Sequence, residues 1–419
     1  MPTPRQAALN MLNQVLTEGR LMSEAGVQRA LEGLDGASKA RAMRLANETL
    51  RNIERADKLL KAHLRKAPSP YVINLLRLAT VELAQGGDAH GVVNEAVTLV
   101  SKHKKYGSMK GLVNAVLRKV AADVPDKFNI LRAPRLPKWL RGPLSEAYSR
   151  EIVGAMELAH HAGAPLDISV KSDAAGWAEK LGGVLTPFGS VRLQDAGQVT
   201  ALEGFSEGDW WVQDAAAALP AKLLNAQAGE TVLDMCAAPG GKTMQLAAAG
   251  AQVTALDLSE NRLKRVQENL ERTHLTANIV CGDALEHEGS YDAVLLDAPC
   301  SATGTIRRHP DLPHAKNGDT FGPLIELQAH MLAHTANLVK KGGRLVYCTC
   351  SLLPDEGEVQ VEDFLETHPD FTADTEALKQ DGIDASWITE EGGLRLRPDY
   401  WGELGGMDGF YIAVLKRAQ

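Results

Sequence analysis

The sequence has few cysteines and aromatic residues, and it has no long apolar segment. Cysteine occurs five times in 419 residues, and an odd number in a long chain indicates reduced thiols rather than a disulfide framework. No apolar run approaches the roughly 18 residues of a membrane-spanning helix, and the N-terminus lacks the apolar core of a signal peptide. These absences argue against a disulfide-rich secreted protein and a membrane protein. We expect a cytoplasmic protein with no membrane partner.

The charge of the chain is unevenly distributed. Residues 1–120 carry 19 Lys and Arg against 10 Asp and Glu, whereas the remaining residues carry 26 against 43. A basic segment on an acidic protein suggests a face for a polyanion such as nucleic acid, although basic helices are often only solvated surface. The apolar fraction of 44% and the charged fraction of 23% are typical of a globular protein, and the length predicts two or three domains.

Two segments precede the most regular part of the chain. Residues 1–122 show apolar residues at helical spacing, and Ser69 followed by Pro70 is a typical helix start. We predict an all-α domain whose densest basic cluster contains Lys102, Lys104 and Lys105 as candidate RNA contacts. Residues 123–205 are richer in Pro, Gly and short alternating runs, and they predict a linker and a small α+β subdomain.

Residues 206–419 alternate between strand-like and helix-like segments. The strands are predicted in TVLDMC, QVTALDLS, ANIVCGDAL, YDAVLLDAP, GGRLVYCTCS and DGFYIAVLKR. This alternation predicts a multidomain protein whose last domain is α/β, Rossmann-like and doubly wound around a mostly parallel sheet. Ligands of such sheets bind beyond the carboxyl ends of the strands, so the residues that follow each strand are the candidate site.

The loop after the first predicted strand of this domain reads DMCAAPGGKT and opens a helix with two glycines. A phosphate-binding P-loop would need a glycine where Cys236 stands, and a dinucleotide loop would need G-x-G-x-x-G. The remaining interpretation is the S-adenosyl-L-methionine loop of a Rossmann-like methyltransferase. Asp257 and Asp283 end the next two strands, where carboxylates can accept from the ribose hydroxyls and the adenine amino group.

Two cysteines follow strands that are neighbours in this fold class. Cys300 lies in DAPC and Cys350 in TCS, so both are expected at the methyl donor. A thiolate that adds to C6 of cytosine makes C5 nucleophilic, and the site should therefore lower the pKa of one cysteine. Asp297 is placed to hydrogen-bond N3 and the amino edge of the base. Spacing alone leaves open which cysteine attacks, whereas Cys281 and Cys348 are expected to be buried apolar groups.

These motifs resemble the Nop/Sun family of RNA (cytosine-5)-methyltransferases, through DMCAAPGGKT, ALDLSENRL, GDA, LLDAPCSATGTIRRHPD, VYCTCSLLPDE and DGFYIAVLKR. The resemblance implies that Cys350 is the nucleophile and that Cys300 assists breakdown of the covalent intermediate. It also implies phosphate or base contacts by Arg307 and Arg308. The cofactor and base pocket implied by the same resemblance is formed by Cys236, Ala237, Ala238, Pro239, Gly240, Gly241, Lys242, Asp257, Asp283 and Asp297.

The N-terminal domain resembles the transcription antitermination factor NusB, through VNEAVTLV and GLVNAVLRKV. The combination implies small-subunit (16S) ribosomal RNA as the substrate and S-adenosyl-L-methionine as the methyl donor, with no metal and a monomer favoured. The family often has an Arg-x-Asn element before the catalytic domain, where this chain offers only Lys171. It also lacks the aromatic residue that the family often shows after Pro310.

Other functions remain open at this stage. They are cytosine-5 methylation of another RNA, such as tRNA, or of DNA, a non-catalytic antitermination-like RNA-binding protein, and a Rossmann oxidoreductase. A DNA methyltransferase would require Cys300 for activity. A non-catalytic RNA-binding protein would not bind S-adenosyl-L-methionine.

Overall fold

The computed structural model describes residues 2–194 and 196–419, and the chain forms two compact units. The helical unit contains the chain up to Ala162 together with Ile306–Gly318. The sheet unit contains Gly163–Thr305 and Asp319–Gln419. The predicted boundaries at 122 and 205 do not coincide with these units. The segment predicted as linker and subdomain is divided between them: residues 123–162, with two further helices, belong to the helical unit, and residues 163–205 belong to the sheet unit.

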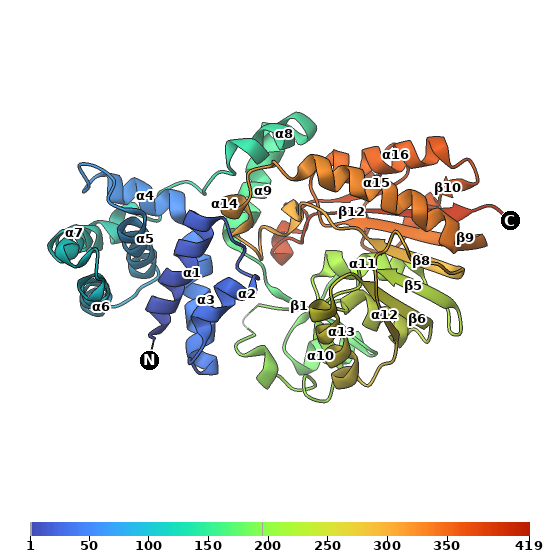
Figure 1. Cartoon of the computed structure of the whole chain (residues 1–419), viewed down its shortest axis with the longest axis horizontal. Coiled ribbons are helices and arrows are strands. Elements are labelled where there is room, and N and C mark those ends of the chain that lie inside the picture. The colour runs from blue at the N-terminus through green and yellow to red at the C-terminus, as the bar shows by residue number, and fades with distance from the viewer. Residues whose placement is uncertain (1, 195) are drawn as a thin grey trace. The chain divides into compact units, whose positions relative to one another are not determined.

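The helical unit is built from helices that bury one apolar face each, as predicted for residues 1–122 (Figure 1). Pro4 and Pro70 begin two of them, and Asp35 and Asp88 cap two others by accepting from backbone N–H groups. The helices are α1 (Pro4–Glu18), α2 (Ala25–Gln28), α3 (Gly36–Arg51), α4 (Ile53–Lys61), α5 (Pro70–Ala84), α6 (Ala89–Lys102), α7 (Lys110–Lys127), α8 (Lys138–Tyr148), α9 (Arg150–Ala162) and α14 (Leu312–Ala315).

A short segment leaves the sheet unit after Thr305 and returns to it at Asp319. This crossing segment, Ile306–Gly318, contains α14 and folds with the helices. Its Asp311 carboxylate accepts from the backbone N–H of Met22 at 2.8 Å, and the Arg51 guanidinium donates to the carbonyl of Arg307 at 2.9 Å. The sequence analysis placed this segment in the last domain. In the structure the polar groups of this segment find their partners on α3 and on the loop after α1, so it folds with the helical unit.

The sheet unit begins with a small antiparallel sheet of strand order β2-β3-β1-β4, from the segment predicted to hold short strands. Inside it, the fully buried Arg192 and Asp167 form a bidentate ion pair with distances of 2.7 Å. Arg192 also donates to the carbonyls of Leu404 and Gly406, so the small sheet is fixed to the C-terminal loops. Its elements are β1 (Leu166–Val170), α10 (Ala174–Lys180), β2 (Val184–Leu185), β3 (Val191–Leu193) and β4 (Trp210–Val212).

The large sheet has the order β10-β12-β9-β8-β5-β6-β7, with β11 paired to β12. The strands from β9 to β7 are parallel, as the sequence predicted, and β12, β10 and β11 add an antiparallel edge. The strands are β5 (Thr231–Met235), β6 (Gln252–Asp257), β7 (Asn278–Cys281), β8 (Tyr291–Asp297), β9 (Val339–Thr349), β10 (Phe371–Ala373), β11 (Leu394–Leu396) and β12 (Phe410–Arg417).

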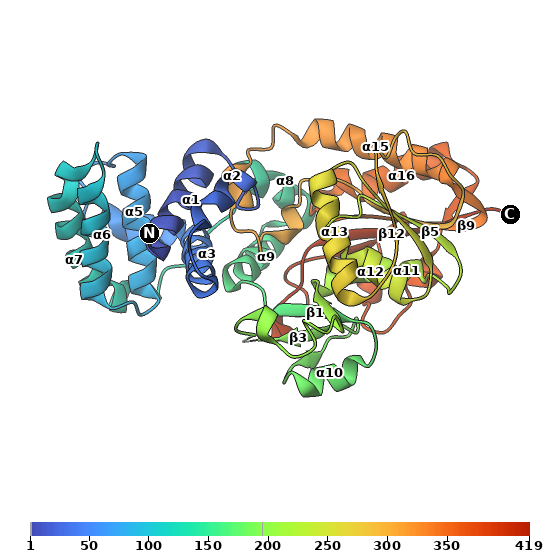
Figure 2. The ribbon, with the colours of Figure 1, turned by 60° about the horizontal axis from the view of Figure 1, so that its bottom comes forward.

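Helices cover both faces of this sheet, which confirms the predicted Rossmann-like architecture (Figure 2). One face packs against α11 (Ala215–Leu224), α12 (Gly241–Ala248) and α13 (Glu260–Thr273), and the other against α15 (Phe321–Leu338) and α16 (Glu358–Thr367). Within the described ranges, no helix has the length and apolar character needed to cross a membrane.

The predicted pairing of the two cysteine-bearing strands is confirmed. β8 and β9 are parallel neighbours, and Asp297 at the end of β8 lies opposite Cys348 on β9. Because parallel strands end at the same edge of the sheet, the loops that follow β8 and β9 start side by side. The loop after β8 carries Cys300, and the loop after β9 carries Cys350.

Candidate active site

A cavity of about 490 Å³ lies at the carboxyl edge of β5, β6, β7, β8 and β9. Its size falls in the range of small-molecule sites, and most of its lining is apolar. The structure brings together in its wall seven of the residues predicted for the site: Cys236, Ala238, Asp257, Asp283, Asp297, Cys300 and Cys350. The other members of the predicted loop, Ala237, Pro239, Gly240, Gly241 and Lys242, do not line this cavity.

The loop between β5 and α12 is shaped by two residues with positive φ, Cys236 and Gly240. Gly240 has φ +100° and stands directly before α12, and a Cβ there would lie 3.2 Å from the side chain of Val266 on α13. Glycine is therefore required for both conformation and space. The Thr243 hydroxyl donates to the buried Asp234 carboxylate at 2.5 Å, which fixes the first turn of α12 against the end of β5.

Asp257 and Asp283 occupy different environments in the cavity. Asp257 is buried, and its carboxylate accepts from the backbone N–H groups of Ala238 at 3.2 Å and Ser259 at 3.0 Å. It therefore links the end of β6 to the loop after β5. Asp283 is exposed and accepts from the backbone N–H of Leu285 at 2.9 Å. Both carboxylates retain acceptor capacity toward a ligand in the cavity, because each oxygen has two lone pairs.

Lys242 forms an ion pair with Asp297, with 2.7 Å between the ammonium and the carboxylate. Burial disfavours the charge on Lys242, but the attraction of and hydrogen bond to Asp297, together with neighbouring groups that include Asp234, outweigh it and raise the pKa of the lysine. The ammonium also lies over the ring of Phe410, 5.5 Å from its centroid. The sequence assigned Lys242 to the cofactor loop and Asp297 to the base, and it did not predict their pairing.

Cys300 and Cys350 meet with their sulfur atoms 3.4 Å apart. The hydrogen bond to Cys350 and burial raise the pKa of the Cys300 thiol well above its ordinary value. Burial also raises the pKa of Cys348, whose sulfur lies 3.5 Å from Asp297, and raises that of Cys236 to about 12. These three groups are thiols at neutral pH. The prediction that the site lowers the pKa of one cysteine stays a prediction.

Sequence reasoning missed several residues of the site. Arg262 lines the cavity and donates to the Ala238 carbonyl at 2.7 Å, and the side chain of Leu258, directly after Asp257, is 73% exposed there. The position of Leu258 after a strand-ending aspartate was a signal that could have identified it. Glu356, which follows the TCS motif, is fully buried between the two cysteine loops, and nothing in its spacing indicates that position.

The two predicted arginine contacts have different surroundings in the crossing segment. Arg308 is exposed, whereas the side chain of Arg307 is fully buried. The contacts of these two arginines with phosphate or the target base stay a prediction. Lys171, which stands where the family's Arg-x-Asn element is often found, donates to the Thr273 carbonyl at 2.9 Å and so satisfies the end of α13.

The three predicted lysine contacts are exposed at the end of α6. Lys102, Lys104 and Lys105 surround a cluster of aromatic rings formed by Tyr71, His103 and Tyr106. The ring centroids are 4.3 to 5.5 Å apart, and the Lys105 ammonium lies 5.5 Å from that of Tyr106. Cations beside aromatic rings suit a single-stranded nucleic acid, so these lysines stay candidate RNA contacts.

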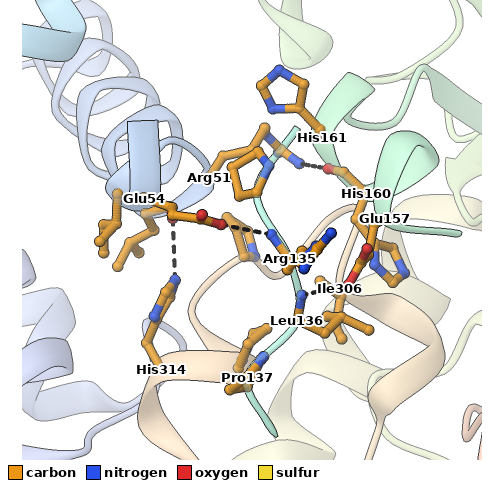
Figure 3. A pocket seen from close by; sticks show the side chains of 15 residues that line it. Arg51, Glu54, Arg135, Leu136, Pro137, Glu157, His160, His161, Ile306 and His314 are labelled. Atoms are coloured by element: carbon orange, nitrogen blue, oxygen red, sulfur yellow. Dashed lines mark hydrogen bonds between the residues drawn. The ribbon is translucent and has the colours of Figure 1, made fainter. Parts of the chain in front are cut away.

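A second cavity, of about 170 Å³, lies within the helical unit (Figure 3). Polar side chains around it form hydrogen bonds to the backbone of distant segments. Arg51 donates to the His160 carbonyl at 2.6 Å, and Glu54 accepts from the backbone N–H of Arg135 at 2.9 Å. The ring of His160 is buried, and neither of its nitrogens has a hydrogen-bond partner among residues 2–194 and 196–419. Burial, together with Arg307 and Arg51, lowers its pKa to about 3.

The comparisons with known proteins agree with this architecture. A family model described as 16S rRNA methyltransferase RsmB/F matches residues 221–416, and the NusB family model matches residues 2–122. A methyltransferase homolog protein from Pyrococcus horikoshii has a TM-score of 0.56 at 26% identity and covers 66% of this chain and 93% of its own. NSun6 from Pyrococcus horikoshii has a TM-score of 0.58 at 19% identity, covering 68% and 98%, which supports the fold alone.

Fold and site together define an RNA methyltransferase with a Rossmann-like catalytic domain and an N-terminal NusB-type domain. The ribosomal RNA small subunit methyltransferase B of Vibrio cholerae is 35% identical over 99% of this chain and 97% of its own length. The protein of the same name from Pseudomonas putida is 35% identical over 98% of each chain. The chain therefore belongs to the family of ribosomal RNA small subunit methyltransferases B, in agreement with its resemblance to the Nop/Sun enzymes.

Proposed function

We propose that this protein transfers a methyl group from S-adenosyl-L-methionine to C5 of a cytosine in small-subunit ribosomal RNA, through a covalent bond between Cys350 and C6. The observation that carries the proposal is the approach of Cys300 and Cys350 to 3.4 Å in the same cavity as three strand-end carboxylates. The names of the relatives support the ribosomal substrate.

The cavity suits the methyl donor in its shape and in its donor set. The exposed Leu258 and the neighbouring Leu285 offer apolar contacts to an adenine ring, while Asp257 and Asp283 offer acceptors for hydroxyl and amino groups. The small side chain of Ala238, which lines the cavity, lets a ligand approach the backbone of the loop. When bound, S-adenosyl-L-methionine supplies an electrophilic methyl group on a sulfonium.

The two cysteines take different parts in the proposed chemistry. The thiolate of Cys350 forms a bond to C6, and the electron pair of the C5–C6 double bond makes C5 the nucleophile for the methyl group. The C5 proton then passes to solvent water, the electron pair of the C5–H bond restores the C5–C6 double bond, the S–C6 bond breaks, and Cys350 departs as a thiolate. Cys300, whose raised pKa keeps it a thiol, can donate its S–H to the departing sulfur at 3.4 Å. The raised pKa of Cys300 supports its part in release, and the resemblance of the TCS motif supports Cys350 as the nucleophile.

Asp297 lines the cavity together with these cysteines and presents an acceptor there, while Lys242 does not line the cavity and pairs with Asp297. Cytosine offers the complementary donor in its exocyclic amino group. Asp297 can accept from the amino group, as the sequence predicted for it.

The test uses small-subunit ribosomal RNA in which cytosine is replaced by 5-fluorocytosine, a base whose C5 fluorine cannot leave as a proton. With wild-type protein and S-adenosyl-L-methionine, we expect an RNA adduct that survives denaturing electrophoresis. Cys350→Ala should form none and should lose more than about 10³-fold in methylation. Cys300→Ala should form adducts and should retain them even on ordinary RNA, because release is impaired.

The opposite pattern in the two variants would move the nucleophile to Cys300. Parallel reactions with tRNA, large-subunit ribosomal RNA and duplex DNA identify the substrate. Equal adduct yields on these nucleic acids would contradict specificity for small-subunit ribosomal RNA.

A further inference from the structure

The two cysteines reach each other from loops that are distant in the chain. Cys300 is the third residue after β8, and Cys350 is the first after β9. Pairing of β8 and β9 brings the two loops to the same edge of the sheet, but the strands end before the sulfur atoms. Additional contacts must therefore set the distance of 3.4 Å between them.

One buried carboxylate joins the residues that directly follow the two cysteines. Oε1 of Glu356 accepts from the backbone N–H of Ser301 at 2.8 Å and from Nε2 of Gln328 at 3.0 Å. Oε2 accepts from the hydroxyls of Ser301 and Ser351, each at 2.5 Å. Ser301 follows Cys300 and Ser351 follows Cys350, so a single side chain holds both cysteine loops.

The backbone of Glu356 holds the end of β9 as well. Its carbonyl accepts from the Tyr347 hydroxyl at 3.0 Å and from the Thr349 hydroxyl at 2.9 Å, one residue before Cys350. The side chains of Ser301, Thr303 and Ser351 contact one another at 3.1 to 3.3 Å around the carboxylate. The result is a connected polar network beneath the two thiols.

The hydrogen bonds explain how a carboxylate can lie there. A fully buried carboxylate without partners costs several kcal/mol, and four donors to its two oxygens compensate that cost. Glu356 does not line the cavity, so it has no access to a ligand there. Its position favours a role that is exerted through the two serines.

We propose that Glu356 is a positioning residue that sets the approach of Cys300 to Cys350 by holding Ser301 and Ser351. This inference rests on the proposed function, because the distance matters only if both sulfurs take part in the reaction. Glu356 has a second, electrostatic effect. After the hydrogen bond to Cys350 and burial, its negative charge also contributes to the raised pKa of Cys300.

The test compares Glu356→Gln with Glu362→Gln, a control on the exposed side of α16. The glutamine has the same shape, but it replaces one acceptor oxygen with a donor. We expect Glu356→Gln to bind S-adenosyl-L-methionine as the wild type does, in calorimetry, and to form the 5-fluorocytosine adduct at least about 10-fold more slowly in single turnover. Glu362→Gln should match the wild type in both measurements.

Two further readouts separate positioning from a general loss of structure. Diamide oxidises two adjacent thiols to a disulfide and takes up both hydrogens, so its rate of joining Cys300 to Cys350 reports their approach. We expect that rate, measured by peptide mass mapping, to fall in Glu356→Gln. The alkylation of Cys300 by iodoacetamide should shift to lower pH, because the variant lacks the negative charge that helps to raise the pKa.

Wild-type rates of adduct formation and of disulfide formation in a folded Glu356→Gln protein would overturn the proposal. If that variant fails to fold, Ser351→Ala takes its place, since it removes one of the four hydrogen bonds, and an unchanged disulfide rate there would also overturn it. If the wild type forms no RNA adduct, the proposed function fails, while the diamide rates still test the role of Glu356.

Discussion

Gly304 illustrates how closely the loops of the site approach one another. Its backbone N–H donates to the Cys350 carbonyl at 2.9 Å, and its own carbonyl accepts from the N–H of Gly409 at 2.8 Å. A Cβ at this position would lie 2.0 Å from the Gly409 carbonyl oxygen and 2.9 Å from that of Cys350. The need for glycine here comes from space, because three stretches of backbone meet around it.

We predict that Gly304→Ala displaces the Cys350 loop. Methyl transfer should fall at least about 10-fold, since misplacement by 1 Å can cost 10²-fold, while binding of S-adenosyl-L-methionine should persist. Single-turnover methylation and calorimetry measure the two effects. Gly322→Ala in α15 is the control, because a Cβ there meets nothing within 4 Å. Equal rates for the two variants would contradict this account.

At the scale of an element, helix α9 carries His160, a buried histidine whose neutral state makes the stability of the fold depend on pH. The pKa of His160 is about 3 in the folded protein, lowered by burial and by the charges of Arg307 and Arg51. The unfolded chain binds a proton near the ordinary pKa of 6.5. Its contribution to stability is therefore complete above pH 6.5 and decreases as the pH falls toward 3.

We predict that the free energy of unfolding is lower at pH 5 than at pH 7.5 by roughly 2 kcal/mol through His160 alone. His160→Leu should flatten this dependence, because leucine fills a site in which the ring nitrogens have no partner among the described residues. Urea unfolding at the two pH values measures the difference. The control His90→Leu, at an exposed histidine, should keep the wild-type dependence of the unfolding free energy on pH. Equal unfolding free energies of the wild type at the two pH values would refute the prediction.

At the scale of the whole molecule, the two kinds of charge are separated along the chain. The basic residues 1–120 include the lysines around Tyr71, His103 and Tyr106, whereas the acidic remainder contains the cavity with its carboxylates. Neutralisation of RNA phosphates by lysine releases counterions, so binding through such a surface depends on salt. We expect the helical unit to contribute affinity for RNA in this way, and we propose the sheet unit as the site of the chemistry.

We predict that replacing Lys102, Lys104 and Lys105 by glutamine weakens RNA binding and reduces its salt dependence. On single strands, each neutralised phosphate contributes about 0.7 to the slope of log binding constant against log salt concentration. The loss of three lysine contacts should therefore decrease the magnitude of this slope by about 2. Fluorescence anisotropy at several salt concentrations provides the slope. A variant with glutamine at the exposed Lys341, Lys379 and Lys416 has the same net charge, and an equal loss of slope in it would contradict the prediction.

Local sequence patterns determined the element types and much of the chemistry. Strand and helix periodicities predicted β5 to β9, β12 and the helices α12, α13 and α15, because burial of one or two faces is encoded over a few residues. The shorter β10 and β11 were not predicted, since three-residue strands carry little periodicity. Strand-end positions also predicted the shared cavity of Asp257, Asp283, Asp297, Cys300 and Cys350.

Contacts between distant residues were decided only by the tertiary structure. The Asp311 carboxylate accepts from the backbone N–H of Met22, 289 positions away in the sequence, and this contact joins the crossing segment to the helical unit. Arg307 in the same segment is buried. Glu356 reaches Ser301 across 55 positions, and Lys242 reaches Asp297 across the same number. The sequence alone determined which groups stand at the strand ends. Their distances and partners depend on the packing of loops, because no local periodicity encodes which side chains meet there.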